Sequence, residues 1–376
     1  MAPPTDRPQT PGTPPLPPAE AIRLLRALTE AHGVPGAEQA VRQIFLQELS
    51  GHGTVLTDRL GSAAVERVGT GPRVLVAAHF DEVGFAVQHI TPRGFIKLVP
   101  LGGWWTHTLL AQRVRILTRA GTEILGVIGS TPPHFLGDTA KDKLLPIEQL
   151  YVDVGADSRT AAEALGIALG DPVAPDSAFT PLAGGQRFMA KAFDNRCGVA
   201  AAVQTTQLLH AEPLPCCLIA AGSVQEEVGC RGAVTLAALT RPDVALVMEG
   251  TPADDTPGLP ADDQQGALGS GVQIRVLDPT ALMNRRLVEL AVSTATSLGI
   301  PYQLAVRRGG GTDAKSYQFH ETGVPCLVLA PPARYIHSHN SVLHLEDYLN
   351  TVRLTAALVR RLDAGTVASL TDWHSP

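Results

Sequence analysis

The order of strand-like and helix-like segments limits the possible folds of this chain more than any other feature of its sequence. After residue 178, short apolar runs with the length of buried strands alternate with segments of helical periodicity. The same alternation precedes residue 85, where two helix-like segments lead into an apolar run that ends at His79. Alternation of this kind predicts an α/β fold in which helices flank a mostly parallel sheet.

Apolar spacing also predicts the individual elements of the α/β part. Helices are expected at residues 19–31, 37–49, 197–210, 280–298 and 345–362. Strands are expected at residues 73–78, 215–222, 243–248, 271–277, 302–307 and 324–330. Continuous apolar runs are typical of strands that are buried on both faces, so the sheet is expected to lie between helical layers.

Between residues 85 and 178 the alternation stops. Short apolar runs, such as 113–117 and 123–128, are separated by clusters of Gly, Pro and Thr, and one helix-like stretch occurs near 158–166. This pattern is typical of an all-β unit, and we expect a small β-barrel inserted into the α/β domain. Two consecutive domains are the alternative. That order would separate His79 from the other candidate ligands, which all follow residue 190.

The predicted organisation therefore has four segments. They are a disordered proline-rich tail (1–18), a first part of the catalytic domain (19–84), the inserted barrel with a role in oligomerisation or substrate access (85–178), and a second part of the catalytic domain (179–376). The tail carries eight prolines, one arginine and no apolar stretch, so it does not have the features of a secretory signal.

Composition argues against several classes of partner. Apolar residues make up 44% of the 376-residue chain and the formal net charge is −6, which gives no reason to expect nucleic acid or an anionic membrane as a partner. The longest apolar runs are well short of the ~20 residues of a membrane-spanning helix. The five cysteines are odd in number and lack a Cys-x-x-Cys pattern, so reduced thiols and a cytoplasmic location are expected.

Side chains that bind metals or transfer protons occur in five short stretches where strands are predicted to end. The stretches are His79-Phe80-Asp81-Glu82, Asp194-Asn195-Arg196, Gln225-Glu226-Glu227, Glu249, and Arg334-Tyr335-Ile336-His337. Active sites of open α/β sheets form at the carboxyl ends of the strands. Two imidazoles and three carboxylates, one of them able to bridge, are what two neighbouring divalent metals need. The pattern indicates a two-metal hydrolase in which Asp81 and Glu226 remain free to orient groups and move protons.

Three of these stretches also have a simpler interpretation. His79 fits a surface turn beside two acids as well as it fits a metal site. Asp194 opens an Ala-rich helix and, taken alone, is better explained as a helix N-cap. Two acids at a strand end, such as Glu226 and Glu227, are usually solvated, although their glycine-flanked position between buried elements favours a pocket. Glu249 ends a strand that is too apolar for an acid to be expected inside it.

Two loops contain competing ligand candidates. The loop 250–269 is long enough to suggest a function, but its acids are interpreted as a solvated face; these acids are Asp254, Asp255, Asp262 and Asp263. The final loop contains three histidines. His337 is the preferred ligand because it follows a short extended segment, and His339 is the second choice ahead of His344.

A glycine-rich stretch precedes a short predicted helix at residue 314. Its candidate substrate-binding residues are Gly310, Gly311, Thr312 and Asp313. Glycines permit close backbone approach, and helix N-terminal amides can hold an anionic group. A phosphate loop is the alternative, but no Gly-Lys-Ser/Thr follows. The chain also lacks the Gly-x-Ser-x-Gly motif of serine hydrolases and the His-Glu-x-x-His motif of thermolysin-type proteases.

Taken together, these stretches resemble the tetrahedral (TET) aminopeptidase family of dinuclear metallopeptidases, which includes glutamyl and deblocking aminopeptidases and the so-called endoglucanase M group. The resemblance covers about residues 19–365. It extends to pieces with no catalytic side chain, such as Gly102-Gly103 with Gln112-Arg113-Val114, and the stretch from Leu150 to Ala156. The long interval between His79 and Asp194 puts the insertion where this family has it. Single-domain aminopeptidases and carboxypeptidase-like deacylases differ in this respect.

The resemblance implies a role for each candidate residue. One metal would be held by His79, Asp194 and Glu249, and the other by Asp194, Glu227 and His337, with Asp194 as the bridge. Asp81 would lie behind His79, and Glu226 would be the general base. Two positions depart from the family pattern: Asn195 stands where a second Asp is common, and Glu249 stands where many members have Asp. The family also implies a cis peptide bond after Asp194.

The expected activity is removal of N-terminal residues from peptides by metal-activated water, with Glu226 as the general base. Two divalent ions per subunit are expected, with Zn or Co preferred and Mn as a further candidate. The expected partners are peptide substrates and further copies of the chain, from a dimer to a dodecamer, without nucleic acid or membrane. A metal-dependent deacylase or amidase acting on N-blocked amino acids is the alternative enzyme, and a non-catalytic scaffold homologue is the alternative outside catalysis.

Overall fold

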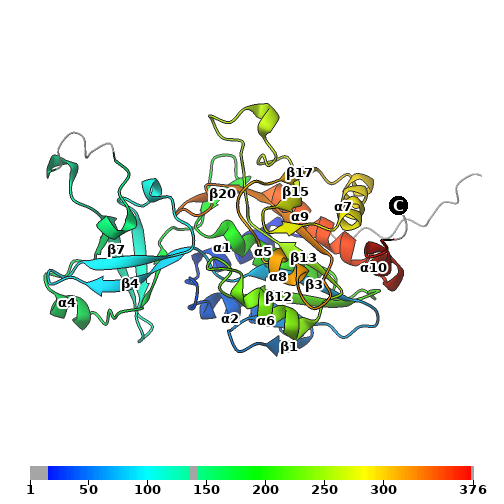
Figure 1. Cartoon of the computed structure of the whole chain (residues 1–376), viewed down its shortest axis with the longest axis horizontal. Helices are drawn as coiled ribbons and strands as arrows, with labels where there is room; N and C mark the ends of the chain where they lie inside the picture. The colour runs from blue at the N-terminus through cyan, green and yellow to red at the C-terminus, as the bar shows by residue number, and fades with distance from the viewer. Residues whose placement is uncertain (1–15, 136–142, 374–376) are drawn as a thin grey trace, which may run out of the picture.

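The computed structural model describes residues 16–135 and 143–373. The predicted proline-rich tail lies outside the described residues except for its last three positions. The described part of the chain contains an α/β body and, on its left in Figure 1, a separate closed β-barrel formed by the segment drawn in cyan and green. Among the helices of the described part, none is long and apolar enough to cross a membrane.

A nine-stranded sheet forms the centre of the α/β body. Its order is β1-β2-β12-β3-β13-β18-β15-β16, with β17 also paired to β15. The bounds are β1 Thr54–Thr57, β2 Ala63–Glu66, β3 Arg73–His79, β12 Cys217–Ser223, β13 Val244–Met248, β15 Val272–Asp278, β16 Ala281–Leu282, β17 Tyr302–Val306 and β18 Cys326–Ala330. The four strands at its centre, β12, β3, β13 and β18, run parallel. These strands are buried almost throughout, as continuous apolar runs predict.

Helices cover both faces of this sheet (Figure 1). On one face α5 (Phe193–Leu208) contacts β3, and α1 (Pro18–Glu30), α2 (Gln39–Glu48) and α9 (Leu345–Val359) pack against α5. On the other face, α6 (Arg231–Thr240) contacts β12, and α8 (Ala314–Gln318) contacts β18. A last helix, α10, spans Ala364–Leu370. The predicted α/β class with a mostly parallel sheet is confirmed.

One predicted helix begins later than expected. The helix predicted at 280–298 is α7, which spans Arg285–Leu298, and residues 281–282 form the short strand β16 instead. Asn284 sets the start of α7, because its side-chain oxygen accepts a hydrogen bond from the backbone N–H of Leu287 at 3.0 Å. An N-cap of this kind ends the preceding extended segment and satisfies a free helical donor.

The segment that breaks the alternation forms the predicted barrel. Six strands close in the order β4-β5-β8-β7-β6-β9 around their own apolar core. They are β4 Gly84–Ile90, β5 Ile96–Leu101, β6 Arg113–Leu117, β7 Glu123–Gly129, β8 Tyr151–Asp153 and β9 Pro172–Pro175, and the helix α4 spans Arg159–Ala164. The barrel is therefore inserted directly after β3, as expected.

A small second sheet, which the sequence patterns did not predict, adjoins the point where the chain returns from the barrel. Its order is β10-β11-β20-β19-β14. The strands are β10 Thr180–Pro181, β11 Arg187–Ala190, β14 Thr251–Pro252, β19 Pro332–Arg334 and β20 Ser341–His344. Because β11 pairs with β20, the segment that leads into Asp194 lies beside the loop that carries His337.

Candidate metal centre

The candidate ligands meet at the carboxyl end of the central sheet. His79 is the last residue of β3, and its register partner on β12 is Ser223, which precedes the Glu226–Glu227 turn. Glu249 directly follows β13. Parallel neighbouring strands end at the same edge of a sheet, so three stretches that are far apart in sequence come together there.

The first ligand group contains His79, Asp194 and Glu249, of which His79 and Glu249 are buried. The His79 Nε2 atom lies 3.3 Å from Asp194 Oδ1 and 3.3 Å from Glu249 Oε1. The His79 side chain is only 2% exposed. The second group contains Asp194, Glu227 and His337: the His337 Nε2 atom lies 3.2 Å from Asp194 Oδ2 and 3.3 Å from Glu227 Oε2. Asp194 thus offers one carboxylate oxygen to each group.

Both imidazoles are oriented by backbone carbonyl groups. The Nδ1 atom of His79 lies 3.0 Å from the Asp81 carbonyl oxygen, and the Nδ1 atom of His337 lies 2.9 Å from the Gly103 carbonyl oxygen. A carbonyl oxygen only accepts hydrogen bonds, so each Nδ1 donates. In the neutral imidazole the lone pair is then on Nε2, the atom that faces the carboxylates, which is the tautomer required for metal ligation.

The charges of the centre are strongly coupled. Burial opposes protonation of His79, but Glu249 and Asp194 raise the pKa of its imidazole well above its ordinary value. Burial likewise opposes protonation of His337, but its contacts with Asp194 and Glu227 raise its pKa to about 9. The two imidazoles in turn hold the pKa of Asp194 well below its usual range, against the effect of burial. Burial raises the pKa of Glu227 to about 8 and also raises the pKa of Glu249.

These residues fit divalent cations. Within each group the ligand atoms all lie within 4.8 Å of one another. The buried Glu227 Oε1 atom has no hydrogen-bond partner within the described ranges. A buried carboxylate oxygen without a partner is costly, and a cation beside it would remove that cost. Imidazole and carboxylate donors suit Zn and related divalent ions, which bind as protons leave the ligands.

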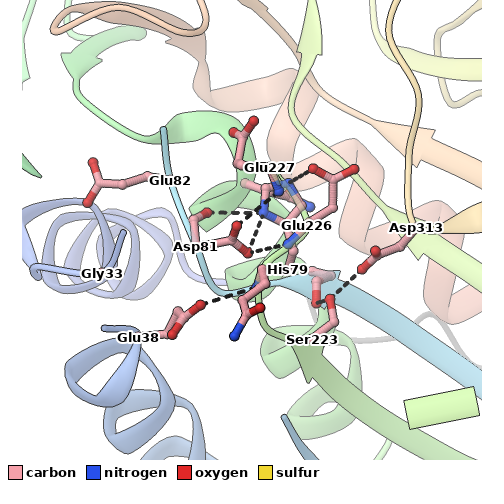
Figure 2. A network of polar contacts seen from close by, with 12 residues as sticks. Gly33, Glu38, His79, Asp81, Glu82, Ser223, Glu226, Glu227 and Asp313 are labelled. Atoms are coloured by element: carbon pink, nitrogen blue, oxygen red, sulfur yellow. Dashed lines mark hydrogen bonds and ion pairs between the residues drawn. The ribbon is translucent and has the colours of Figure 1, made fainter. Parts of the chain in front are cut away.

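Asp81 has a wider role in the geometry than orienting His79. Its carboxylate Oδ1 lies 3.5 Å from His79 Nδ1, whereas its backbone oxygen makes the shorter contact. The Asp81 carboxylate mainly accepts hydrogen bonds from the backbone N–H groups of Glu226 and Glu227, each at 3.0 Å. Figure 2 shows Asp81 beside His79, with dashed lines from its carboxylate to this turn. A single buried side chain therefore links β3 to the two adjacent acids.

Glu226 lies at the edge of the first ligand group, with its two oxygens in different surroundings. Its Oε1 accepts a hydrogen bond from the Cys230 thiol at 3.3 Å, and its Oε2 lies 4.0 Å from His79 Nε2. Burial raises the pKa of Glu226 well above its ordinary value, and the nearby Asp313 adds to this shift. Oε2 is therefore the oxygen that faces the centre.

The glycine-rich stretch is divided between surface and core. Gly310 is exposed with φ +78°, whereas Thr312 and Asp313 are buried. Asp313 accepts a hydrogen bond from the Ser223 hydroxyl, and burial raises its pKa to about 7. Figure 2 shows Asp313 on the Glu226 side of the centre. Of the four predicted substrate-binding residues, Asp313 lies nearest to the ligand groups.

The competing candidates are elsewhere. His339 is buried against Trp104, with ring centroids 5.7 Å apart, and belongs to neither ligand group.

The interpretation of Asp254 and Asp255 as a solvated acidic face is wrong. Asp254 pairs with Arg307 at 2.6 Å and Asp255 pairs with Arg334 at 2.5 Å, and both also accept backbone hydrogen bonds within the loop. These two acids order the loop, whereas Asp262 and Asp263 lie in an exposed 3-10 turn.

Sequence patterns did not identify the part of the inserted segment that touches the centre. Gly102 has φ +88°, and a Cβ atom there would approach Val83 Cγ1 to 2.7 Å and Glu227 Cβ to 3.3 Å. Its neighbour Gly103 orients His337. The Gly-Gly pair was the available signal, because adjacent glycines permit a close backbone approach.

Local contacts also explain the residue after Asp194. The Asp194–Asn195 peptide bond is cis, as the resemblance implied. The Asn195 side chain donates to the Met248 carbonyl oxygen at 2.9 Å and accepts from the Gly198 N–H at 3.1 Å. This side chain therefore fixes the start of α5 against the end of β13 and does not face the ligand groups.

Comparisons with known proteins by sequence and by structure all match this chain to aminopeptidases. The sequence profile of the M42 glutamyl aminopeptidase family matches residues 61–354. The glutamyl aminopeptidase of Lactococcus lactis subsp. cremoris (strain MG1363) is 33% identical over 94% of this chain and 100% of its own length. A TET aminopeptidase from the marine sediment archaeon Thaumarchaeota archaeon SCGC AB-539-E09 superposes with a TM-score of 0.91 at 37% identity, covering 94% of this chain and 99% of that structure. The TET1 peptidase of Pyrococcus horikoshii, described as assembling into a tetrahedron or a large octahedral shell, superposes with a TM-score of 0.81 at 31% identity over 91% of this chain and 100% of that structure.

The fold, the acid–imidazole centre and these matches define the protein as an aminopeptidase, a hydrolase that acts on peptide bonds. The chain belongs to the M42 glutamyl aminopeptidase family, and its resemblance to the TET aminopeptidases is confirmed. M42 peptidases are metallopeptidases, and the described part of this chain contains groups of acidic and His side chains that could bind metal.

Proposed function

We propose that this aminopeptidase is dinuclear and removes N-terminal residues from peptides. His79, Asp194 and Glu249 would hold one divalent ion, and Asp194, Glu227 and His337 would hold the other. The observation that carries the proposal is the position of Asp194, whose Oδ1 and Oδ2 atoms lie 3.3 and 3.2 Å from the Nε2 atoms of two different imidazoles. A carboxylate shared in this way supports a bridging role. Zn or Co would suit these ligands, and Mn is a further candidate.

When bound, the two ions would lower the pKa of a water molecule and polarise the scissile carbonyl group. The protein supplies the proton acceptor. We assign this role to Glu226 Oε2, because Oε1 is engaged by the Cys230 thiol while Oε2 faces the centre. The same oxygen would return the proton to the amine that leaves when the peptide bond breaks. Asp81 supports both acids by holding the backbone N–H groups of Glu226 and Glu227.

The position of the ligand groups favours action at a chain end. The free amino terminus of a peptide would dock beside the carboxylates of the centre, which favours an exopeptidase over internal cleavage. The Gly310–Asp313 stretch would line the substrate path, with Asp313 as its member closest to Glu226.

The inserted barrel suggests how access and assembly are arranged. We propose that residues 85–178 form a domain for oligomerisation or substrate access, flanked by catalytic segments 19–84 and 179–376. The TET1 peptidase of Pyrococcus horikoshii supports a homo-oligomer for this chain. We also propose a cytoplasmic location, because the five cysteines are unpaired.

The most direct test is a panel of aminoacyl-anilides with and without N-acyl caps, assayed after reconstitution with Zn, Co or Mn. We expect hydrolysis of the uncapped substrates only, together with two metal ions per chain by elemental analysis. Preference for the capped substrates would favour a deacylase or amidase. Absence of hydrolysis with fewer than two bound ions would favour a non-catalytic scaffold.

A further inference from the structure

The loop between α1 and α2 is hydrogen-bonded at two points to the segments that carry the candidate ligands. At its start, the Gly33 carbonyl oxygen accepts hydrogen bonds from the Arg196 guanidinium at 2.9 Å and from the Glu82 backbone N–H at 3.0 Å. At its end, Glu38 contacts the segment that carries the adjacent acids. The loop therefore connects the end of β3 and the start of α5 to the Glu226–Glu227 turn (Figure 2).

The Glu38 side chain makes an unexpected set of bonds for its position. Glu38 occupies the N-cap of α2 but makes no side-chain capping bond to that helix. Its Oε1 atom instead accepts hydrogen bonds from the Gly36 N–H at 2.8 Å and from the Gln225 N–H at 3.2 Å. Glu38 is only 5% exposed. An acid that is removed from water and turned away from its own helix must gain its stabilisation from these two donors.

The turn that Glu38 contacts has an uncommon backbone conformation. Gln225 has φ +59°, a left-handed value that is uncommon for a residue other than glycine. The backbone N–H groups of Gln225, Glu226 and Glu227 are bound in succession by Glu38 Oε1, Asp81 Oδ1 and Asp81 Oδ2. Two buried carboxylates thus hold three consecutive amide groups, and a strained turn persists only when its surroundings hold it in this way.

We propose that Glu38 is a positioning residue, which together with Asp81 fixes the turn that presents Glu226 and Glu227 to the centre. The inference rests on the proposed function of these two acids as base and metal ligand. Without Glu38 the Gln225 N–H would lose its hydrogen-bond partner, and the turn would relax toward an ordinary backbone conformation. Glu226 Oε2 and Glu227 Oε2 would then move away from His79 and His337.

The test compares Glu38→Ala with Glu38→Gln. The glutamine side-chain oxygen still accepts both hydrogen bonds, whereas alanine removes the acceptor. We expect Glu38→Ala to lower kcat roughly 10- to 100-fold with KM changed by less than about threefold, and to weaken the binding of one of two metal ions roughly tenfold. Glu38→Gln should restore both values to within about threefold of the unmodified enzyme.

Asp347→Ala is the matched control for a purely structural role. Asp347 is also a buried carboxylate, 1% exposed, that accepts two backbone N–H bonds, from Gly269 and Gly271, but it does not touch the centre. This variant should lower Tm and leave kcat per folded molecule unchanged. If Glu38→Ala behaves like Asp347→Ala, or keeps kcat and metal affinity within twofold, the proposal is overturned.

Two further measurements keep the test decisive. If Glu38→Ala does not fold, Glu38→Asp is measured instead, because the shorter side chain does not reach Gln225. Unchanged kcat and metal affinity in Glu38→Asp would overturn the proposal. If the unmodified enzyme has no peptidase activity, the proposed function fails on its own. Metal affinity and hydrogen exchange of the amides at 225–227 then still decide the role of Glu38, with exchange expected to be at least about tenfold faster in Glu38→Ala. Unchanged exchange would overturn the proposal.

Discussion

The two ligand groups of the centre use the same kinds of side chain but are supported in different ways. His79 ends a buried strand and is 2% exposed, and its partner Glu249 directly follows another buried strand. His337 lies in a loop with φ +56°, is 34% exposed, and is oriented by Gly103 of the inserted segment. The first group therefore depends on the central sheet, whereas the second depends on how the barrel meets the α/β body. Since Asp194 belongs to both, it is the residue through which one group affects the other.

The largest effect is expected for Asp194→Ala, which removes the side chain common to both groups. Both ions should be lost, and peptide hydrolysis should fall by about 10⁴-fold or more, because each ion contributes several kcal/mol of transition-state stabilisation. Elemental analysis after dialysis and aminoacyl-anilide hydrolysis are the measurements. Two ions still bound per chain would refute the shared role of Asp194.

A slightly smaller loss is expected for Glu226→Gln, which removes the proposed proton acceptor without removing a proposed ligand. Turnover should fall roughly 10²- to 10⁴-fold while both ions stay bound. The adjacent variant Glu227→Gln is the matched control, because it changes the same chemical group at a ligand position and should also weaken one ion. Near-normal hydrolysis by Glu226→Gln would refute its assignment as the base.

Removing His79 should reduce the free energy of unfolding more than removing His337. In the presence of a chelator, His79→Ala should reduce the free energy of unfolding by about 3 kcal/mol, because it leaves buried carboxylates without their partner. His337→Ala should reduce it by less than about 1 kcal/mol, because the His337 side chain is partly solvated. Urea unfolding of both metal-free variants measures the difference. Equal reductions in the free energy of unfolding would show that the central sheet does not hold the first group more firmly than the loop holds the second.

Sequence patterns single out the candidates at strand ends more clearly than the candidate in the final loop, and the reason is physical. A continuous apolar run such as 73–78 has few alternatives to a buried strand, so an imidazole or acid at its end is conspicuous. An acid such as Glu249 after the run 243–248 draws attention for the same reason. The helix at 345–362 and the all-β character of 85–178 were likewise evident from local periodicity.

Long-range contacts of short segments could not be predicted in this way. The strands β10 and β14 contain two residues each, which is too short for any periodicity to be visible. The pairing of Asp254 with Arg307 and of Asp255 with Arg334 depends on where a loop folds back, which local composition does not specify. Glu38 and Gln225 are 187 positions apart, so nothing local to either residue indicates their contact.

The smallest effect concerns the barrel side of the second group and tests whether the inserted segment supports it. The Trp104 ring stacks on Phe85, with centroids 4.8 Å apart, and its Nε1 donates to the Gly84 carbonyl oxygen at 2.9 Å. Trp104→Ala should loosen the adjacent Gly103 carbonyl that orients His337, and weaken one ion roughly tenfold while the other is unchanged. Isothermal titration of the metal-free enzyme measures both affinities.

The neighbouring tryptophan provides the control for this variant. Trp105 is 63% exposed, so Trp105→Ala removes a similar side chain at an adjacent position without removing buried packing. Both affinities should be unchanged in Trp105→Ala. If Trp104→Ala weakens both ions equally, the barrel supports the whole centre and the contrast between the two groups is wrong. If neither ion is affected, the orientation of His337 depends on its own loop, whose backbone is already held at φ +56°.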